Sequence, residues 1–490
     1  MNINEAIEKI SSSNDLEKEE IKKVFLSIMK NECNDAEIIS FLMTLKTKGE
    51  SVGEITGAAE VLREMSQKLE LPSDNLVDTC GTGGDGQNTF NISTASAIVA
   101  AAAGVKIAKH GNKSISSKSG SADLLDHAGI NIDLDENQSK KCFEDHGITF
   151  MFAPKYHKAM KNVAKVRKSI KTRTIFNVLG PLSNPANAKY QILGVYDQKL
   201  VKPIAEVARE LGVERALVVH SEEGLDEISC EKDTYVAELK DNQITEYKIN
   251  PKDFGLELCS LENLKVKTVE ESYKIFLGML KNDNKEAVNI VCLNAGAAIY
   301  LSGIKSSLSD GIKLAKETIE SGEALKKYQT IVNSMPEKVK TPKILEEILQ
   351  NKEKEVNERK TKIPLEDLIE IDYMKSFKRK FKQALLQKLE QNKPAVIAEI
   401  KRASPSMGEI NMNIMPAKVA SDFEEMGATC LSVLTDAKYF KGSGAILEMA
   451  KKGCNLPILR KDFIIDEYQI DESVVMGADC ILLIAAALEK

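Results

Sequence analysis

The sequence lacks the features that would place it in a membrane, in an extracellular disulfide framework or on nucleic acid. No apolar run approaches the roughly 18 residues of a spanning helix, and the N-terminus has no basic-then-apolar signal pattern. The nine cysteines include no Cys-x-x-Cys pair, which predicts reduced thiols rather than disulfides or a zinc site. The net charge is −6, and tryptophan is absent. We therefore expect a soluble, cytoplasmic protein with no membrane or nucleic-acid partner.

Length and patterning divide the chain into three regions. The 490 residues, 43% of them hydrophobic, have material for more than one core. Residues 1–70 have apolar positions at helical spacing and no chemically distinctive side chain, so we expect a small helical domain, joined by later helices. Strands and helices alternate over residues 71–336, as in a parallel α/β sheet. A polar stretch bounded by prolines, residues 337–343, predicts a linker to a third region, residues 344–490.

The most informative stretch is residues 76–94, LVDTCGTGGDGQNTFNIST. A short apolar strand meets four glycines in six residues, and a helix then opens at an Asn/Ser/Thr cluster. Glycines at this density let backbone N–H groups turn inward and approach an anion. The helix start adds unpaired N–H donors and the positive end of its dipole. The stretch therefore predicts a phosphate or pyrophosphate cradle.

Two better-known phosphate motifs fit this stretch less well. Gly81, Gly83 and Gly86 have the spacing of the dinucleotide fingerprint, which needs a helix at the third glycine and an acidic residue after the next strand. Here five residues precede the helix, and the next strand leads to the basic Lys109. A P-loop is excluded because no Gly-Lys-Ser/Thr closes the loop.

A second anion site is predicted where the next strand ends, at the sequence KHGN of residues 109–112. Residues 113–121 add two lysines and five serines, and another helix opens at Ser121. In isolation this is an ordinary polar loop. Beside the first cradle, it suggests one ligand with phosphates at both ends.

Three further features leave alternatives open. Arg167 lies on the apolar stripe of a predicted helix, residues 159–170, where it needs a carboxylate or phosphate partner; a structural salt bridge explains it equally well. Residues 174–185 are predicted as an apolar strand or loop. His110 and His157 have the alternative of being ordinary hydrogen-bonded histidines.

An acidic loop follows the predicted strand of residues 216–220 and contains Asp226 and Glu227. Adjacent carboxylates on a glycine-bent loop can hold Mg²⁺, which substrate phosphates then share. Most such loops are merely solvated, but a pyrophosphate cradle in the same sheet makes a metal expected. Residues 232–249 alternate like a β-hairpin, and helices follow to about residue 334.

Taken together, six motifs over residues 1–336 resemble the anthranilate phosphoribosyltransferase family. They are residues 78–85 (DTCGTGGD), 91–94 (NIST), 109–112 (KHGN), 119–123 (SGSAD), 173–182 (RTIFNVLGPL) and 225–229 (LDEIS). The resemblance implies a helical domain joined to an α/β domain, usually as a homodimer. It implies Mg²⁺-dependent transfer of the 5-phosphoribosyl group from phosphoribosyl pyrophosphate (PRPP) to anthranilate, in tryptophan biosynthesis.

The resemblance also implies roles for individual residues. Those implied to hold the pyrophosphate and its metal are Gly81, Gly83, Gly84, Asp85, Thr89, Asn91, Ser93 and Thr94. Those implied to bind the other phosphoribosyl groups are Lys109, Asn112 and Ser121. The implied Mg²⁺ ligands are Ser93, Asp226 and Glu227, and the implied anthranilate channel is His110, Asn112, His157, Arg167 and Pro181, with Arg167 meeting the carboxylate.

The third region shows four apolar strands, at residues 395–400, 430–434, 458–459 and 480–484, with helices between them. Residues 398–406 (AEIKRASPS), 432–436 (SVLTD) and 459–463 (LRKDF) resemble the indole-3-glycerol-phosphate synthase family. This implies catalytic roles for Glu399, Lys401 and Lys461, with Lys461 as the general acid. Because such a barrel has eight strands, we expect a partial (β/α)8 barrel of about four βα units, inactive alone or completed by a separate chain.

Two other functions remain possible for the first 336 residues. One is a pyrimidine-nucleoside-phosphorylase-like enzyme of similar architecture, and the other is a non-catalytic binding or assembly subunit. The intact glycine-rich stretch and the Asp226-Glu227 pair favour an enzyme over a binding subunit.

Overall fold

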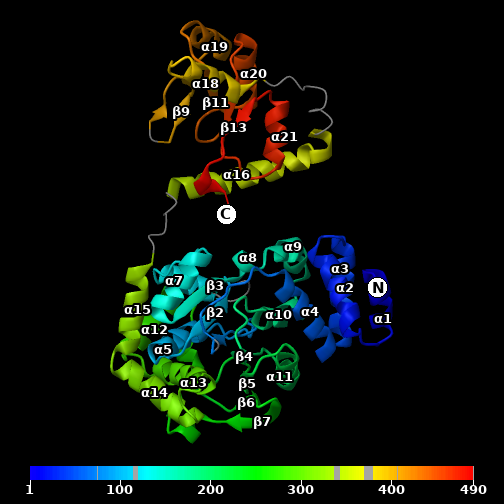
Figure 1. Cartoon of the computed structure of the whole chain (residues 1–490), viewed down its shortest axis with the longest axis vertical. Coiled ribbons are helices and arrows are strands. Elements are labelled where there is room, and N and C mark those ends of the chain that lie inside the picture. Colours follow the sequence, from blue (N-terminus) through cyan, green and yellow to red (C-terminus); the bar gives the residue numbers. More distant parts are fainter. Residues whose placement is uncertain (74, 114–119, 336–342, 369–378, 406, 489–490) are drawn as a thin grey trace. The chain divides into compact units, whose positions relative to one another are not determined.

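The computed structural model describes residues 1–73, 75–113, 120–335, 343–368, 379–405 and 407–488. They form two compact units, Met1–Lys338 and Val339–Lys490 (Figure 1). The predicted linker, residues 337–343, lies outside the described residues except at Lys343, where a helix begins. Within the described ranges, no helix has both the length and the apolar character needed to cross a membrane.

Four helices begin the first unit, as the apolar periodicity of residues 1–70 predicts. They are α1 (Ile3–Ser11), α2 (Lys18–Met29), α3 (Asp35–Lys48) and α4 (Val52–Met65). Asn34 caps α3 with its side chain, and Ser51 caps α4. The aromatic ring of Phe25 packs against Phe41 of the same bundle and Phe176 of a later helix, so the bundle shares its core with the rest of the unit.

A seven-stranded sheet forms the centre of the first unit, in the order β3-β2-β1-β4-β5-β6-β7. Its strands are β1 (Val77–Thr79), β2 (Ile107–Gly111), β3 (Ile148–Phe152), β4 (Tyr190–Gly194), β5 (Arg215–Ser221), β6 (Thr234–Lys240) and β7 (Gln243–Ile249). The first five are parallel, and β6 and β7 form the predicted antiparallel hairpin.

Strand β1 is the point at which the strand order reverses. Val77 pairs with Ile107 of β2 on one side and with Tyr190 of β4 on the other. In open α/β sheets, ligands bind beyond the carboxyl ends of the strands at such a reversal. The glycine-rich stretch follows β1 directly, so the topology places it in this crevice.

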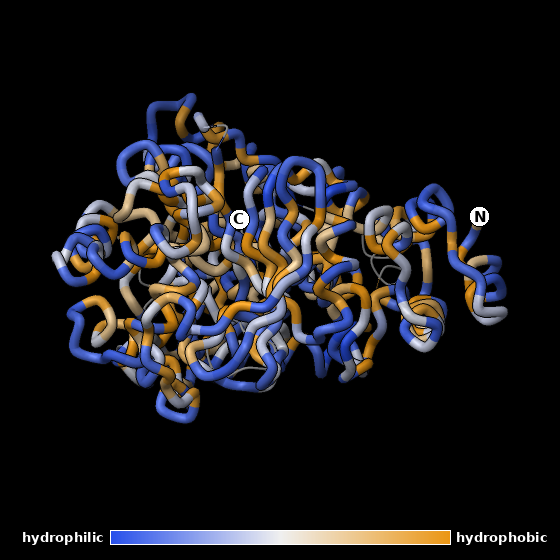
Figure 2. Tube along the Cα trace, turned by 90° about the horizontal axis from the view of Figure 1, so that it is seen from below, coloured by the Kyte–Doolittle hydropathy of each residue, from blue (hydrophilic) through white to orange (hydrophobic). Residues whose placement is uncertain are grey.

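Helices cover both faces of the sheet (Figure 1). They are α5 (Ile92–Ala102), α6 (Ser121–His127), α7 (Glu136–His146), α8 (Ala153–Tyr156), α9 (Lys161–Ile170), α10 (Ile175–Leu182), α11 (Val201–Glu210), α12 (Val269–Leu280), α13 (Lys285–Leu301), α14 (Leu308–Glu320) and α15 (Glu323–Ser334). Alternate strand residues enter separate cores: Leu217 packs with α5 and α13, and Val218 packs with α11. Figure 2 shows the hydrophobic stretches along the interior strands and the hydrophilic stretches on outer loops.

The expected strand or loop at residues 174–185 is wrong, because Ile175–Leu182 is the helix α10. The β-branched and aromatic side chains of this segment favour a strand by propensity. A capping box overrides that preference, since the N–H of Thr174 donates to Asn177 Oδ1 at 3.0 Å. The apolar side chains then pack into the core shared with α4.

The expectation that all cysteines are reduced is also corrected. Cys230 and Cys259 form a disulfide with their Cα atoms 5.6 Å apart, and seven cysteines are free. The backbone N–H of Cys259 donates to the carbonyl of Cys230. The fold thus brings together two segments 29 residues apart, a proximity that cysteine spacing alone cannot reveal.

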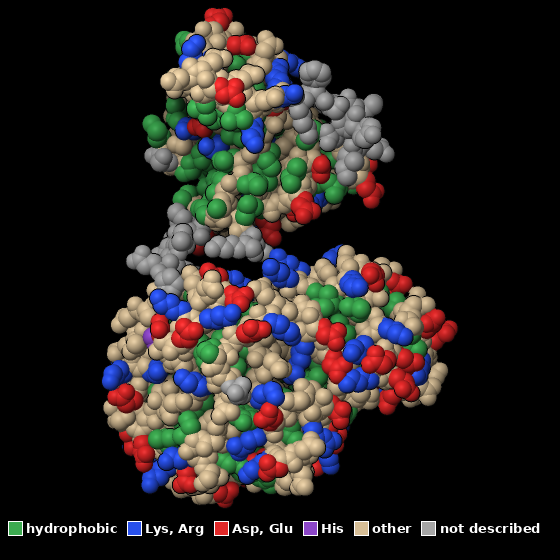
Figure 3. Space-filling view, in the orientation of Figure 1, with side chains coloured by type: hydrophobic (Ala, Val, Ile, Leu, Met, Phe, Trp, Pro, Cys, Tyr) green, Lys and Arg blue, Asp and Glu red, His purple; other side chains and the backbone are tan. Residues whose placement is uncertain are grey.

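The second unit has a four-stranded parallel sheet in the order β13-β12-β11-β8, as expected for a partial barrel. Its strands are β8 (Ile397–Ile400), β11 (Cys430–Leu434), β12 (Ile458–Lys461) and β13 (Cys480–Ile481), with a small hairpin of β9 (Ala403–Ser404) and β10 (Gly408–Glu409). Its helices are α16 (Lys343–Lys362), α18 (Phe381–Glu390), α19 (Pro416–Glu425), α20 (Gly444–Gly453) and α21 (Tyr468–Val475). Hydrophobic side chains gather on the face of this unit that Figure 3 shows.

Candidate active site

The glycine-rich loop after β1 depends on glycine for its backbone path. Gly83, Gly84 and Gly86 have φ values of 64°, 70° and 81°, a region that side-chain-bearing residues rarely adopt. The N–H of Thr82 donates to the carbonyl of Gly194 at 2.8 Å, which ties the loop to the end of β4. The loop is therefore held at the carboxyl edge of the sheet.

Asp226 packs directly against this loop. A Cβ atom at Gly81 would lie 2.5 Å from Asp226 Oδ2, and one at Gly194 would lie 1.7 Å from the Asp226 carbonyl oxygen. The N–H of Gly83 donates to Asp226 Oδ2 at 2.8 Å. Two strand-end glycines thus make room for the acidic loop after β5 to reach the cradle.

Three carboxylates converge where these loops meet. The side chains of Asp85 and Asp226 hydrogen-bond each other, which requires a shared proton. Burial, and for Asp226 also the charge of Asp85, raises the pKa of both groups above the usual range of aspartate. Burial followed by the charge of Asp226 likewise raises the pKa of Glu227, whose carboxylate accepts a bond from the N–H of Ser93.

This donor set suits a hard divalent cation. Crowded carboxylates that share a proton can exchange it for a cation, and an oxygen-only set matches the preference of Mg²⁺. Among the described residues, no group of three or more His, Cys, Asp or Glu side chains forms a ready metal cage. An ion held by Asp226 and Glu227 would thus need further ligands from water and substrate oxygens.

The other acidic side chains of the same loop have partners of their own. Glu222 pairs with Lys248 at 2.8 Å, and Glu223 accepts a hydrogen bond from the hydroxyl of Ser229. Asp226 contacts the glycine-rich loop and Glu227 lines the pocket beside Gly81, and their role as metal ligands stays a prediction of the sequence motif.

The start of α5 supplies the opposite wall. Lys109 Nζ, on the buried β2, lies 3.3 Å from Ser93 Oγ and also donates to the carbonyl of Thr79. Thr94 Oγ1 donates to the side chain of Asn91, and Thr89 forms a β-bridge with Lys265 that carries the chain into this helix. A buried cation and a helix N-terminus thus face the carboxylates across the site.

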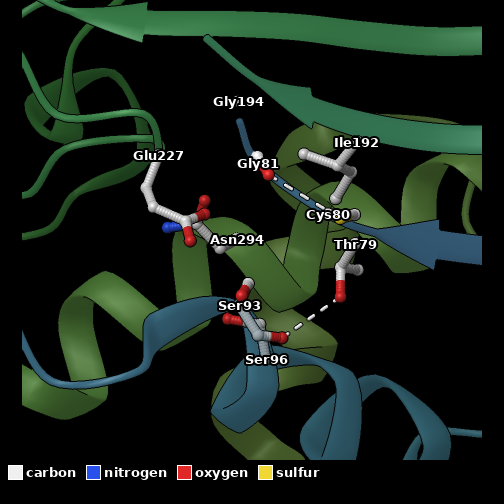
Figure 4. Close-up of a pocket in the computed structure, with 9 residues that line it drawn as sticks. All are labelled: Thr79, Cys80, Gly81, Ser93, Ser96, Ile192, Gly194, Glu227 and Asn294. Atoms are coloured by element: carbon white, nitrogen blue, oxygen red, sulfur yellow. Dashed lines mark hydrogen bonds between the residues drawn. The ribbon is translucent and has the colours of Figure 1, made fainter. Parts of the chain in front are cut away.

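A small pocket lies between these walls (Figure 4). Its lining residues are Thr79, Cys80, Gly81, Ser93, Ser96, Ile192, Gly194, Glu227 and Asn294. The Ser96 hydroxyl is buried and has no hydrogen-bond partner in the described part of the chain. The sequence analysis missed Ser96 and Asn294; the isolated asparagine in the apolar run of α13 was a detectable clue.

The end of β2 forms a second close contact with Ser121. A Cβ atom at Gly111 would lie 2.2 Å from Ser121 Oγ, and the N–H of Asn112 donates to the same oxygen at 3.2 Å. Ser121 opens α6, as predicted. The other four serines of this segment belong to residues 114–119, outside the described residues.

His110 and His157 form a buried ring pair with centroids 5.1 Å apart. Within the described residues, neither ring nitrogen of His110 nor Nε2 of His157 has a hydrogen-bond partner. Burial lowers the pKa of His110 to about 3 and that of His157 to about 4, so both rings are neutral near pH 7. Asp78 fixes the main chain here by accepting bonds from the N–H of His110 and from Asn184 Nδ2.

Arg167 extends from α9 over the ring of Phe176, with its guanidinium carbon 5.4 Å from the ring centroid. It forms no ion pair with any described residue, so the salt-bridge alternative has no partner in this part of the chain. Burial lowers its pKa. Pro181, on the neighbouring α10, is buried.

Arg173 contacts the glycine-rich loop, although the sequence alone assigned it no individual role and only included it in the motif of residues 173–182. Its guanidinium donates to the carbonyl of Gly84 and stacks over the ring of Tyr196, 4.2 Å from the centroid. Tyr196 in turn donates its N–H to Thr82 Oγ1 at 3.2 Å. Arg173 and Tyr196 therefore both support the glycine-rich loop, at Gly84 and at Thr82.

The second unit brings its three candidate residues together. Lys401 Nζ lies 3.0 Å from Glu399 Oε1, and Lys461 Nζ lies 3.5 Å from Glu399 Oε2. All three are at the carboxyl ends of β8 and β12, where β/α barrels place catalytic groups. Partial desolvation raises the pKa of Glu399, but the neighbouring Lys401 and Lys461 outweigh it, so the pKa is lowered.

Comparisons with known proteins match both units to enzyme families. The glycosyl transferase family matches over its helical bundle domain at residues 4–66 and its a/b domain at residues 73–325. The indole-3-glycerol phosphate synthase family matches at residues 345–490.

Individual relatives are similar over the first unit. The chain is 51% identical to anthranilate phosphoribosyltransferase from Marinomonas sp., covering 68% of this chain and 97% of that protein. It is 47% identical to the Hydrogenovibrio crunogenus enzyme, covering 70% and 99%. The crystal structure of the Thermus thermophilus enzyme aligns with a TM-score of 0.63 and 38% identity over 67% of this chain and 98% of that one. A Saccharomyces cerevisiae structure in complex with PRPP and Mg aligns at 0.62 and 30% identity, covering 68% and 98%.

Proposed function

This chain belongs to the anthranilate phosphoribosyltransferase family, and on that premise we propose which of its residues carry out each part of the reaction. The enzyme transfers the 5-phosphoribosyl group of PRPP to the amine of anthranilate and releases pyrophosphate. The observation that supports our assignment is the direct packing of Asp226 against the loop of Gly81 and Gly83. Metal carboxylates and a pyrophosphate cradle then meet at one point.

In this proposal the glycine-rich loop and the start of α5 bind the pyrophosphate group. The backbone N–H groups of this loop donate to its oxygens, except those of Thr82 and Gly83, which are already bonded to Gly194 and Asp226. Asn91, Ser93 and Thr94 at the start of α5 assist. Lys109, Asn112 and Ser121 bind the remaining phosphoribosyl oxygens. Donors that are fixed before the reaction stabilise the negative charge that develops on the leaving group.

Ser93, Asp226 and Glu227 hold Mg²⁺ in this proposal, and Asp85 assists from the glycine-rich loop. When bound there, Mg²⁺ supplies neutralisation of the charge on the pyrophosphate. Because the carboxylates and the pyrophosphate share the ion, the carboxylates also orient the substrate. Glu227 is held against α5 by the N–H of Ser93.

Anthranilate occupies the region of His110, Asn112, His157, Arg167 and Pro181 in this proposal. The guanidinium of Arg167 has no anionic partner among the described residues and is therefore available to the substrate carboxylate. The neutral histidine rings offer an apolar face with nitrogens that can bond the ring substituents. The aromatic amine loses its proton readily once bonded, so no dedicated general base is assigned.

We further propose a homodimer formed through the helical part of the first unit. Ile7 on α1 and Ile39 on α3 are only partly buried, and Met43 has 36% of its side chain exposed. Such apolar positions on neighbouring helices suit a partner surface.

For the second unit we propose a half barrel that is completed by another polypeptide segment. The strands β8 and β13 are its two edges, and Val396 and Ile397 beside the first edge are 49% and 45% exposed. The lyase residues Glu399, Lys401 and Lys461 are already grouped. The segment that completes it would carry the phosphate site of a barrel.

The proposal for the first unit is tested by following anthranilate fluorescence with purified protein. Consumption should require both PRPP and Mg²⁺, and EDTA should stop it. Consumption that persists without PRPP, or binding of PRPP that ignores Mg²⁺, would contradict the assignment.

A further inference from the structure

A buried asparagine on α13 reaches the loop that carries Asp226 and Glu227. Asn294 lies in the middle of α13, Lys285–Leu301, a helix that is otherwise apolar over its buried length. It is 2% exposed. Asparagine is unfavourable in a helix interior, and a buried amide is costly unless its hydrogen bonds are made. Its presence therefore calls for a specific partner.

That partner is the main chain of Ile228, the residue immediately after Glu227. The N–H of Ile228 donates to Asn294 Oδ1 at 2.9 Å, and Asn294 Nδ2 donates to the carbonyl of Ile228, also at 2.9 Å. A third bond, from Nδ2 to the carbonyl of Ile290 at 2.9 Å, fixes the amide to its own helix. Asn294 and Glu227 both line the pocket (Figure 4).

The acidic loop needs such support in the state that would bind a cation, because its carboxyl groups are then ionised. Burial, and for Asp226 also the charge of Asp85, raises the pKa of these groups, so holding Asp226 and Glu227 ionised together is unfavourable. The N-terminal side of the loop is held by packing on Gly81 and Gly194. On the C-terminal side, the two hydrogen bonds with Asn294 hold the main chain of Ile228, the residue after Glu227.

We propose that Asn294 is a positioning residue for the metal site, acting through the backbone of Ile228 to keep Glu227 turned towards Ser93. This rests on the proposed function, in which Asp226 and Glu227 hold Mg²⁺. Asn294 touches neither substrate nor metal in this role. Its effect is to keep the carboxylates preassembled, as partners behind metal ligands commonly do.

The test is Asn294→Ala, with Asn289→Ala as the matched control. Asn289 is on the same helix and also donates to a loop carbonyl, that of Glu257, at 3.2 Å, but away from the site. Two quantities are measured against Mg²⁺ concentration: initial rate, and the rise in thermal midpoint that PRPP produces. Manganese binding with PRPP, followed by electron paramagnetic resonance, gives a third measurement independent of turnover.

We expect Asn294→Ala to raise the Mg²⁺ concentration for half-maximal effect about tenfold in both titrations, a usual effect of removing such a partner. Manganese affinity should fall in parallel, while saturating Mg²⁺ restores the rate and the KM for anthranilate changes by less than about twofold. The Asn289→Ala protein should match the parent. If Asn294→Ala does not fold, Asn294→Ser, which keeps a small polar group, should show the same shift in smaller measure.

A lower midpoint without any change in metal dependence would overturn the positioning role and leave Asn294 as a structural tie. This outcome is distinct from failure of the proposed function. In that case the parent protein itself would show no Mg²⁺-dependent binding of PRPP.

Discussion

The carbonyl oxygen of Asp226 lies against the Cα of Gly194, so closely that a methyl group at position 194 would sit 1.7 Å from that oxygen. The contact joins the end of β4 to the acidic loop after β5. Because the obstacle is backbone rather than a flexible side chain, relief requires that the loop itself move. The position of Asp226, a proposed metal ligand, therefore depends on the absence of a side chain on a neighbouring strand.

Gly194→Ala should reduce kcat/KM by about 100-fold or more, since displacements of the order of 1 Å in an active site have effects of that size. The added methyl group pushes Asp226 away from Gly83, so PRPP-dependent thermal stabilisation by Mg²⁺ should weaken as well. Steady-state rates and thermal melts measure both effects. Gly53→Ala, in the first turn of α4 with nothing closer than 4.0 Å, is the control and should leave activity unchanged. Parent-like activity of Gly194→Ala would show that the acidic loop can move to accommodate the methyl group without loss of function.

Replacing both metal carboxylates, Asp226→Asn with Glu227→Gln, should abolish turnover while leaving the fold intact. The amides keep the shape of the side chains but cannot neutralise a cation, and they also remove buried like charges. The thermal midpoint in EDTA should therefore equal or exceed that of the parent. Glu222→Gln, which changes a carboxylate of the same loop that faces Lys248, should retain activity. Near-normal turnover of the double variant at saturating Mg²⁺ would remove these residues from the metal site.

The contacts behind these two predictions differ in how far the sequence could reveal them. The cradle, the helix that follows it and the Asp226-Glu227 pair were predictable, because glycine density, helix-start residues and adjacent carboxylates are local features. Gly194 was not, since its requirement arises only when β4 is placed beside β5. The role of Asn294 likewise depends on Ile228, which is more than 60 positions away in the sequence. Ser96 stands out only because its buried hydroxyl has no hydrogen-bond partner among the described residues.

The fold shows the same division between local and long-range causes. Helices α1–α4, the β6–β7 hairpin and the four strands of the second unit follow from periodicity, and the structure confirms them. The prediction for Ile175–Leu182 was wrong because its apolar, β-branched composition favours a strand, whereas capping by Thr174 and packing against Phe25 favour a helix. Tertiary contacts decided the outcome against propensity.

Arg167→Ala should raise the KM for anthranilate far more than the KM for PRPP. The loss should be about 1.5–3 kcal/mol in kcat/KM, the usual value of a hydrogen bond to a charged group. Arg167 stacks on Phe176 and has no ion-pair partner in the described residues, so the fold should tolerate its removal. Lys168→Ala, at the exposed neighbouring position, serves as the control. An equal effect on both substrates would indicate a structural role for Arg167.

The histidine pair should make stability fall in mild acid. His110 and His157 have folded pKa values of about 3 and about 4, below the usual 6.5, so the unfolded chain binds more protons between these limits. Their contribution to stability is therefore complete above pH 6.5 and is lost as pH falls, by up to about 1.4 kcal/mol per pH unit for each ring. Asp78 opposes this trend, because burial raises its pKa to about 6.

Comparing the parent with a His110→Gln, His157→Gln double variant isolates the histidine term, since Asp78 and the metal carboxylates are present in both proteins. Urea unfolding from pH 7 to pH 4.5 supplies the free energies. The difference in stability between the two proteins should change in favour of the variant as pH falls. Parallel curves would mean that the two rings take up protons in the folded state as easily as in the unfolded chain.

A polypeptide of these 490 residues should not by itself make indole-3-glycerol phosphate, although Glu399, Lys401 and Lys461 are grouped as the resemblance implies. Its four described strands leave both edges of the sheet without a neighbouring strand in the described unit, whereas a closed barrel joins eight. The phosphate site of such barrels is built from loops after the seventh and eighth strands. The assay is conversion of carboxyphenylaminodeoxyribulose phosphate by the chain alone and with an added polypeptide that carries the remaining strands of the family. Turnover only in the mixture, lost with Lys461→Ala but kept with Lys418→Ala on the exposed part of α19, would show that the added strands complete the half barrel and that Lys461 acts in it. Turnover by the chain alone would contradict the prediction, since four strands would then suffice to hold both the substrate phosphate and the acid Lys461.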